Sequence, residues 1–144
     1  MNMQAISATF LRAVGVLLIV LGVVHLAATP HIPDLLRGSP KAVYDYAVGP
    51  TLLNHVLVGI LLLPLGYTTW LAVGLREKDK RCAVRILVAN TIAVFTLPIS
   101  IAAFMRRPEY YTSPLFLAGV GLVALISVLM AAATYALTRE AKVE

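Results

Sequence analysis

Four long stretches of this chain contain no charged residue, and short charged segments separate them. The uncharged stretches are residues 13–33, 46–75, 86–105 and 110–138. A helix rises about 1.5 Å per residue, so about 20 residues cross the roughly 30 Å of hydrocarbon in a bilayer. Backbone groups cannot remain unpaired in lipid, which favours helices over irregular chain. The pattern therefore predicts four membrane-spanning helices at about 8–28, 50–74, 84–105 and 114–137.

The connection between the first two predicted spans, residues 29–49, is the longest of the predicted loops. It contains three prolines and two glycines, at Pro30, Pro33, Gly38, Pro40 and Gly49. Proline removes a backbone donor and clashes with the preceding turn, so one continuous helix is excluded here. The apolar residues between these breakers favour short pieces that lie on the membrane surface. We expect this outer loop to cap one end of the bundle.

The composition of the chain indicates a membrane protein rather than a soluble one. Of its 144 residues, 60% are hydrophobic and only 13% are charged, about half of the usual quarter. A soluble domain of this size exposes too many of its residues to water to accommodate such a composition. Soluble enzymes, nucleic-acid-binding proteins and disordered regulators are therefore disfavoured. We predict one all-α integral membrane domain over residues 1–144, a four-transmembrane-helix bundle with the lipid bilayer as partner and no nucleic acid.

The basic residues are distributed unevenly between the two sides that the four spans define. Eight lie at the termini and in the segment 76–85, whereas four lie on the opposite side. The positive-inside rule then places both termini and the 76–85 loop in the cytoplasm, and the loops 29–49 and 106–113 outside. The net charge of +5 is therefore interpreted as a topology signal, and we expect a bacterial inner (plasma) membrane location.

Each of the first two predicted spans aligns one histidine with two glycines on a single helix face. These residues are Gly15, Gly22 and His25 in the first span, and His55, Gly59 and Gly66 in the second. Small residues mark packing faces in lipid, because no hydrophobic force drives helices together there. We therefore expect both histidines to point into the bundle, at matching depths one to two turns below the outer surface. His31 lies in the outer loop above them.

Three interpretations of the two span histidines do not require further metal-ligating side chains. In the first, they form hydrogen bonds to each other, to Asn54 or to free carbonyls and serve the structure alone. In the second, two imidazoles from neighbouring helices are axial ligands of haem, in a slot that glycines open. In the third, a histidine N–H donates to a quinone carbonyl, with an arginine such as Arg106 at the headgroup side. The candidate cofactor-binding residues are His25, His55, Asn54 and Arg106.

A metal ion is a fourth interpretation, with His25, His55 and His31 as ligands and Asp34 as a further one. Tetrahedral zinc takes four ligands of this kind, but the chain contains no HxxxH or CxxC spacing. Other chemistry is disfavoured by what the spans lack. No span contains Asp or Glu, the residues that proton-coupled transport usually places in the membrane. The single cysteine, Cys82, excludes an internal disulfide and a two-cysteine redox relay.

Two apolar stretches resemble a known membrane-protein family. The segment Phe10-Leu11-Arg12-Ala13-Val14-Gly15, followed by Gly22-Val23-Val24-His25-Leu26 and Pro30, resembles the opening helix of DoxX-like membrane proteins. The glycine-flanked run 58–66 is similar to their second helix. This chain carries Asn54-His55 where those proteins often have an acidic residue. The resemblance implies a four-helix bundle and, for some members, a role beside quinone-linked redox chemistry.

Two functional hypotheses of different classes follow. The first is a small non-catalytic subunit or accessory protein, which acts by helix packing with itself as a homo-oligomer or with a larger membrane complex. The glycine faces motivate it, and the short loops leave no room for a catalytic domain outside the membrane, which disfavours an enzyme. The second is a membrane redox component that binds quinone or haem at His25 and His55 near the outer leaflet.

Overall fold

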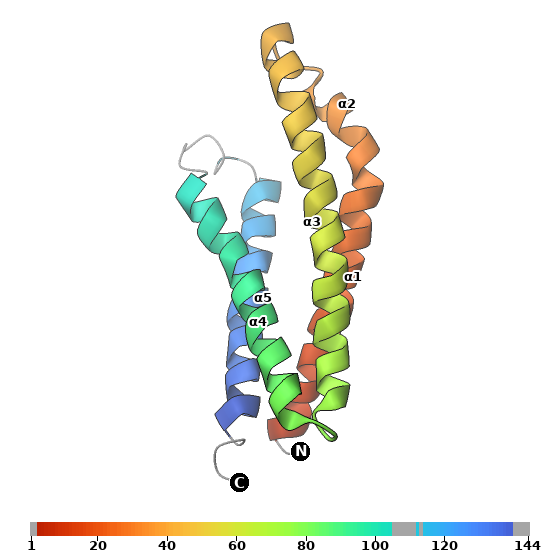
Figure 1. The fold of residues 1–144 in the computed structure, drawn as a ribbon. Coiled ribbons are helices and arrows are strands. Elements are labelled where there is room, and N and C mark those ends of the chain that lie inside the picture. Colours follow the sequence, from red (N-terminus) through yellow and green to blue (C-terminus); the bar gives the residue numbers. More distant parts are fainter. Residues whose placement is uncertain (1–2, 105–111, 113, 140–144) are drawn as a thin grey trace. The chain divides into compact units, whose positions relative to one another are not determined.

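The computed structural model of the protein describes residues 3–104, 112 and 114–139, and its main elements within them are helical. The helices are α1 (Met3–Ala28), the 3-10 turn η1 (Thr29–His31), α2 (Ile32–Leu36), α3 (Lys41–Leu75), α4 (Lys80–Phe104) and α5 (Pro114–Arg139) (Figure 1). Four helical segments among these residues are long and apolar enough to span a membrane, at Ala5–Leu36, Lys41–Leu75, Lys80–Phe104 and Leu117–Thr138. The predicted all-α architecture with four long apolar helices is therefore confirmed.

The structure differs from the expected 29–49 loop, because most of that segment is helical. Only residues 37–40 interrupt the helices, and α3 begins at Lys41 rather than at about residue 50. Pro30 and Pro33 are the second residues of η1 and α2. Proline is tolerated there, since the first turn of a helix has no partner for its N–H groups. Pro50, which the sequence prediction places at the first residue of the second span, lies inside α3.

The chain divides into two compact units, and each is described by itself. The first, residues 15–67, holds most of α1, then η1, α2 and the first part of α3; we call it the histidine unit. The second combines residues 1–14 with residues 68–144, and we call it the terminal unit. It contains the start of α1, the end of α3, and the helices α4 and α5. Whether the chain acts as one domain, as the sequence predicts, stays a prediction.

In the histidine unit, α1 and α3 lie side by side and meet through four buried glycines, Gly15, Gly22, Gly59 and Gly66 (Figure 1). We call these four residues the glycine seam. A Cβ atom placed on Gly22 would lie 2.9 Å from the carbonyl oxygen of Gly59. One placed on Gly66 would meet the carbonyl oxygen of Gly15 and lie 2.8 Å from the backbone nitrogen of Ile19. The two backbones therefore approach so closely that only glycine fits at these positions.

In the terminal unit, α4 packs along α5 around fully buried side chains that include Leu87, Val94 and Met130. Hydroxyl groups join the two helices. The Thr91 hydroxyl donates to the Leu87 carbonyl over 2.7 Å, and its oxygen lies 3.0 Å from the hydroxyl oxygen of Thr134. Because the Thr91 proton is already committed, Thr134 is the donor between the two threonines.

A second hydroxyl link between α4 and α5 lies at a proline. Pro98 is inside α4, and its missing N–H frees the carbonyl four residues earlier, which belongs to Val94. The Ser127 hydroxyl of α5 shares its proton between the Val123 carbonyl at 2.7 Å and this Val94 carbonyl at 3.4 Å. We call Thr91, Thr134 and Ser127 the hydroxyl seam.

The end of α3 is held to α4 by an amide. Asn90, which is buried, donates through Nδ2 to the hydroxyl oxygens of Thr68 at 2.8 Å and Thr69 at 2.9 Å. Thr69 has no exposed surface. An amide and two hydroxyl groups thus enter the interior of this unit as hydrogen-bonded partners, which removes most of the cost of burying them.

Candidate functional site

His25 of α1 and His55 of α3 lie against each other in the histidine unit, at the end of the glycine seam. Their ring centroids are 4.7 Å apart, and the ring planes are inclined by 30°. Both side chains are half-buried. Each histidine lies on the helix face that its glycines mark, as the sequence indicates. Gly22 and Gly59 bring the two backbones close together about one turn away from the rings. The structure thus brings together the two residues on which the sequence hypotheses depend.

The Nδ1 atom of each histidine is engaged with a backbone carbonyl. His25 Nδ1 lies 3.0 Å from the carbonyl oxygen of Leu21, one turn earlier in α1. His55 Nδ1 reaches across to the carbonyl oxygen of His25 at 2.9 Å. The hydroxyl of Thr29 donates to that same carbonyl over 2.8 Å, and its oxygen lies 3.3 Å from His55 Nδ1. The His25 carbonyl is therefore the point at which α1, Thr29 and α3 are joined.

These contacts determine the tautomer of both rings. A carbonyl oxygen only accepts hydrogen bonds, so Nδ1 of His25 and Nδ1 of His55 must each carry a proton. A neutral imidazole carries one N–H, which leaves a lone pair on Nε2 of each ring. Within the described residues neither Nε2 has a hydrogen-bond partner, and no side-chain nitrogen or oxygen there is both fully buried and unpaired. Both Nε2 atoms therefore retain accessible surface and offer a lone pair.

This arrangement favours a hydrogen-bond donor as the ligand. A quinone carbonyl is an acceptor and needs an N–H, which the Nε2 atoms of the neutral rings do not supply. The hydroxyl of a reduced carrier, a quinol, is a donor and fits a lone pair directly. While the rings are neutral, they do not offer the N–H that the predicted contact to a quinone carbonyl requires.

Haem does not fit the observed positions of the two rings. Axial ligands lie on opposite faces of one iron, and a metal–nitrogen bond is about 2 Å long, so the two centroids would be about 6 Å apart. The centroids of His25 and His55 are 4.7 Å apart, which leaves no room for a macrocycle between them. The His25–His55 pair therefore cannot hold one haem as it stands.

The remaining candidate residues do not join the histidine pair. Asn54 is exposed and makes no hydrogen bond with either histidine, and His31 is exposed at the end of η1. Asp34 pairs with Arg37 at 3.0 Å. Across residues 3–104, 112 and 114–139, no three His, Cys, Asp or Glu side chains are grouped to hold a metal ion. Arg106 lies outside the described residues.

Thr29 is a residue of the site that the sequence reasoning missed. It lies four residues after His25, and its hydroxyl bonds back to the His25 carbonyl. Threonine in the last turn of a helix often makes this contact with the carbonyl four residues earlier. That spacing was the available signal, but Thr29 was assigned to a loop instead of a helix end.

No protein-family model, no curated protein and no solved structure matches the chain.

Proposed function

We propose that this chain is an integral membrane protein that binds the reduced, hydroxyl-bearing form of a lipid-soluble redox carrier, a quinol, at His25 and His55. One observation carries the proposal. Both Nδ1 protons are committed to backbone carbonyls, so the two accessible Nε2 atoms offer lone pairs on rings whose centroids are 4.7 Å apart. The site accepts hydrogen bonds and donates none while the rings are neutral.

In a membrane, an Nε2 lone pair without a hydrogen-bond partner costs free energy. A polar atom in an apolar phase loses free energy unless it finds a hydrogen-bond partner, and hydrocarbon provides none. The partner must then be water or a donor that dissolves in lipid. A quinol meets the second condition, because it has an apolar body and two hydroxyl groups. The resemblance of the first two helices to DoxX-like proteins points to the same class of carrier.

The orientation in the membrane is part of this proposal. The excess of basic residues at the termini and in the 76–85 segment supports cytoplasmic termini and an inner-membrane location. The histidine pair would then lie near the outer leaflet, in the region where a hydroxyl-bearing headgroup of a lipid-soluble carrier resides.

The competing hypothesis of a non-catalytic accessory subunit keeps one of its two motivations. It was based on the glycine faces of the first two spans and on the near absence of reactive groups in them. In the structure, the glycines of α1 face those of α3 within one chain, so these faces are already occupied. Association with itself or with a larger membrane complex stays a prediction, and it is compatible with quinol binding.

The test compares the two redox forms of one carrier on the purified chain in lipid nanodiscs. We expect the quinol to bind about tenfold more tightly than the quinone, the effect of about one additional hydrogen bond. Substitution His55→Asn keeps a donor for the His25 carbonyl and removes Nε2, so it should lower quinol affinity about tenfold while the helical circular-dichroism signal is unchanged. The matched control is His31→Asn, outside the pair, which should bind quinol as the unmodified chain does.

Two results would contradict the proposal. One is equal affinity for quinol and quinone in the unmodified chain. The other is a folded His55→Asn chain that binds quinol unchanged. His25→Asn provides an independent repeat, because an asparagine there also keeps a short donor toward the preceding turn and lacks Nε2.

A further inference from the structure

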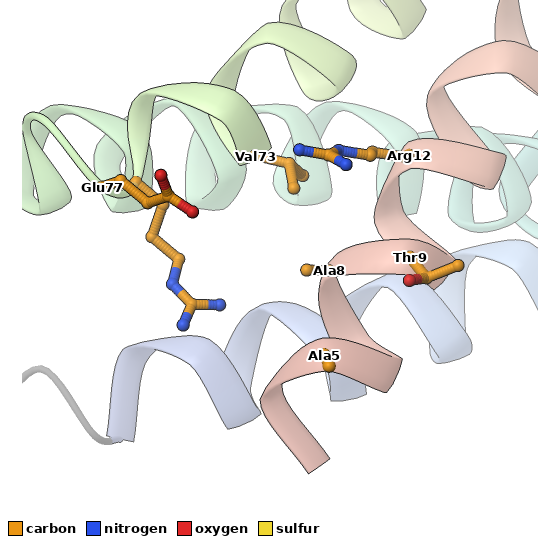
Figure 2. Close-up of a pocket in the computed structure, with 7 residues that line it drawn as sticks. Ala5, Ala8, Thr9, Arg12, Val73 and Glu77 are labelled. Carbon is orange, nitrogen blue, oxygen red and sulfur yellow. The ribbon is translucent and has the colours of Figure 1, made fainter. Parts of the chain in front are cut away.

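A hollow lies in the terminal unit, and neither His25 nor His55 lines it. Its volume is about 340 Å³, and its lining includes Ala5, Ala8, Thr9, Arg12, Arg76 and Glu77. Figure 2 shows Arg12 reaching in from α1 above Ala5 and Ala8, with Glu77 on the opposite side from Thr9. The small side chains of the two alanines leave the space that the charged side chains surround.

Each of the two arginines lies at one end of an uncharged stretch of the chain. Arg12 directly precedes the uncharged stretch 13–33, and Arg76 directly follows the uncharged stretch 46–75. In a bilayer, the ends of such stretches lie where hydrocarbon gives way to headgroups. The hollow is therefore placed at headgroup depth, where the most abundant anion is a lipid phosphate.

The charges in the hollow fit a phosphate. Each guanidinium presents a planar fork of N–H donors that matches two phosphate oxygens. The two arginines come from different segments, α1 and the turn after α3, and converge on one cavity. Further basic residues follow in the same unit, at Lys78, Lys80, Arg81 and Arg85. Such basic surroundings between helices at the membrane surface attract anionic lipids.

Glu77 restricts the choice of headgroup. Its carboxylate repels a phosphate placed directly against it, but it accepts hydrogen bonds from hydroxyl groups. A headgroup that carries hydroxyls beyond its phosphate would use both ends of the hollow, with the phosphate at the arginines and a hydroxyl at Glu77. Phosphatidylglycerol has this chemistry. Phosphatidylcholine has neither the net negative charge nor the hydroxyls.

We propose that this hollow binds the headgroup of an anionic, hydroxyl-bearing phospholipid, with Arg12 and Arg76 holding the phosphate and Glu77 accepting a headgroup hydroxyl. The binding site rests on the membrane location given above but not on the histidine site. A His55→Asn chain, which should lose quinol, should retain the lipid in full. Failure of one proposal is thus distinguishable from failure of the other.

The test is native mass spectrometry of the full chain, released from mixed micelles that contain phosphatidylglycerol or phosphatidylcholine with identical acyl chains. We expect the unmodified chain to retain phosphatidylglycerol about tenfold more than phosphatidylcholine, because the choline cation offsets the phosphate charge and carries no hydroxyl for Glu77. Arg12→Gln and Arg76→Gln should each lower that retention about fivefold or more. Arg37→Gln is the matched control, because Arg37 lies in the other unit and should leave retention unchanged.

Two further variants separate shape and specificity from charge. Ala8→Leu fills the hollow without changing any charge, and it should lower retention about as much as Arg12→Gln. Glu77→Gln should reduce the preference for phosphatidylglycerol over phosphatidylmethanol, which has the same charge and no free hydroxyl. Circular dichroism of each variant establishes that it is folded.

Three outcomes would overturn the proposal. One is equal retention of the two lipids by the unmodified chain. Another is a loss in Arg37→Gln as large as in Arg12→Gln, which would show attraction by overall charge. The last is displacement of the lipid by inorganic phosphate at the concentration at which glycerol phosphate displaces it, because the hollow would then be a site for soluble phosphate.

Discussion

The helix contact inside the histidine unit and the helix contact inside the terminal unit use opposite kinds of residue. Where α1 meets α3, the glycine seam removes side chains altogether and lets carbonyl oxygens approach the facing backbone. Where α4 meets α5, the hydroxyl seam places Thr91, Thr134 and Ser127 between the helices and joins them by hydrogen bonds. Both would suit the membrane setting proposed above, where helices gain little from apolar burial because lipid is as apolar as leucine.

The difference lies in what each contact tolerates. A close backbone contact has no side chain that can move aside, so one added carbon atom must push two helices apart. A hydroxyl contact is adjustable, because a lost hydrogen bond leaves a group that bonds to its own helix instead. We therefore expect steep losses of stability at the glycine seam and shallow losses at the hydroxyl seam. Three sets of variants test this contrast.

The largest effect is expected at the glycine that meets backbone atoms on its neighbour. Gly66→Ala should lower the free energy of unfolding by about 2 kcal/mol, as overpacking at a tight contact does, because its Cβ would lie 2.8 Å from Ile19 nitrogen. Gly121→Ala in α5 is the matched control, since nothing lies within 4 Å of a Cβ there. It should be neutral or stabilise by about 0.5–1 kcal/mol through helix propensity. Reversible unfolding in detergent measures both.

Opposite signs for these two alanine substitutions would support the contrast. Equal effects at Gly66 and Gly121 would show that the glycines matter only through backbone flexibility, and that the close approach of α1 and α3 has no energetic consequence.

An intermediate effect is expected at the buried amide of the terminal unit. Asn90→Ala removes the two hydrogen bonds to Thr68 and Thr69 and should cost about 1 kcal/mol, within the range measured for polar contacts between membrane helices. The matched control is Asn54→Ala, because Asn54 is exposed; its effect should stay within about 0.5 kcal/mol. The same unfolding measurement distinguishes them. A loss at Asn90 larger than that at Gly66 would reverse the proposed order.

The smallest effect is expected at the proline-linked hydroxyl. Ser127→Ala removes the donor to the Val94 carbonyl and should cost about 0.6 kcal/mol. In a Pro98→Ala background, residue 98 regains an N–H that bonds to that carbonyl, so Ser127→Ala should cost about half as much or less. A double-mutant cycle on unfolding free energies measures this coupling. Identical costs of Ser127→Ala in the two backgrounds would show that Ser127 serves Val123 alone.

Much of the fold could be predicted from the sequence, because charged residues mark the ends of the long apolar stretches that form helices. The uncharged stretches located all four long helices, and glycine spacing indicated the faces that carry His25 and His55. The extension of α3 back to Lys41 could not be predicted in this way. A proline considered by itself predicts a break in a helix. Here Pro30 and Pro33 lie in the first turns of η1 and α2, and Pro50 lies inside α3.

The candidate sites were less predictable than the helices. The choice of tautomer depends on which carbonyl each Nδ1 reaches, and Thr29 joins the site only through the geometry at the end of α1. The division into two units leaves no mark in composition. Arg12 and Arg76 were recognised as topology signals, but their position around one hollow depends on how the start of α1 packs against the end of α3. Distances between elements, rather than residue types, were the missing information.

The length of α3 has a consequence for the bilayer itself. Its 35 residues extend about 52 Å, far more than the roughly 30 Å of hydrocarbon that a spanning helix must cross. Tyr46 and Trp70, exposed aromatics of the kind that lie at membrane interfaces, lie near the two ends of its sequence. A thinner bilayer can keep both rings at its two interfaces only if the helix tilts. Hydrophobic mismatch at α3 would thus tie the tilt of this helix to the thickness of its membrane.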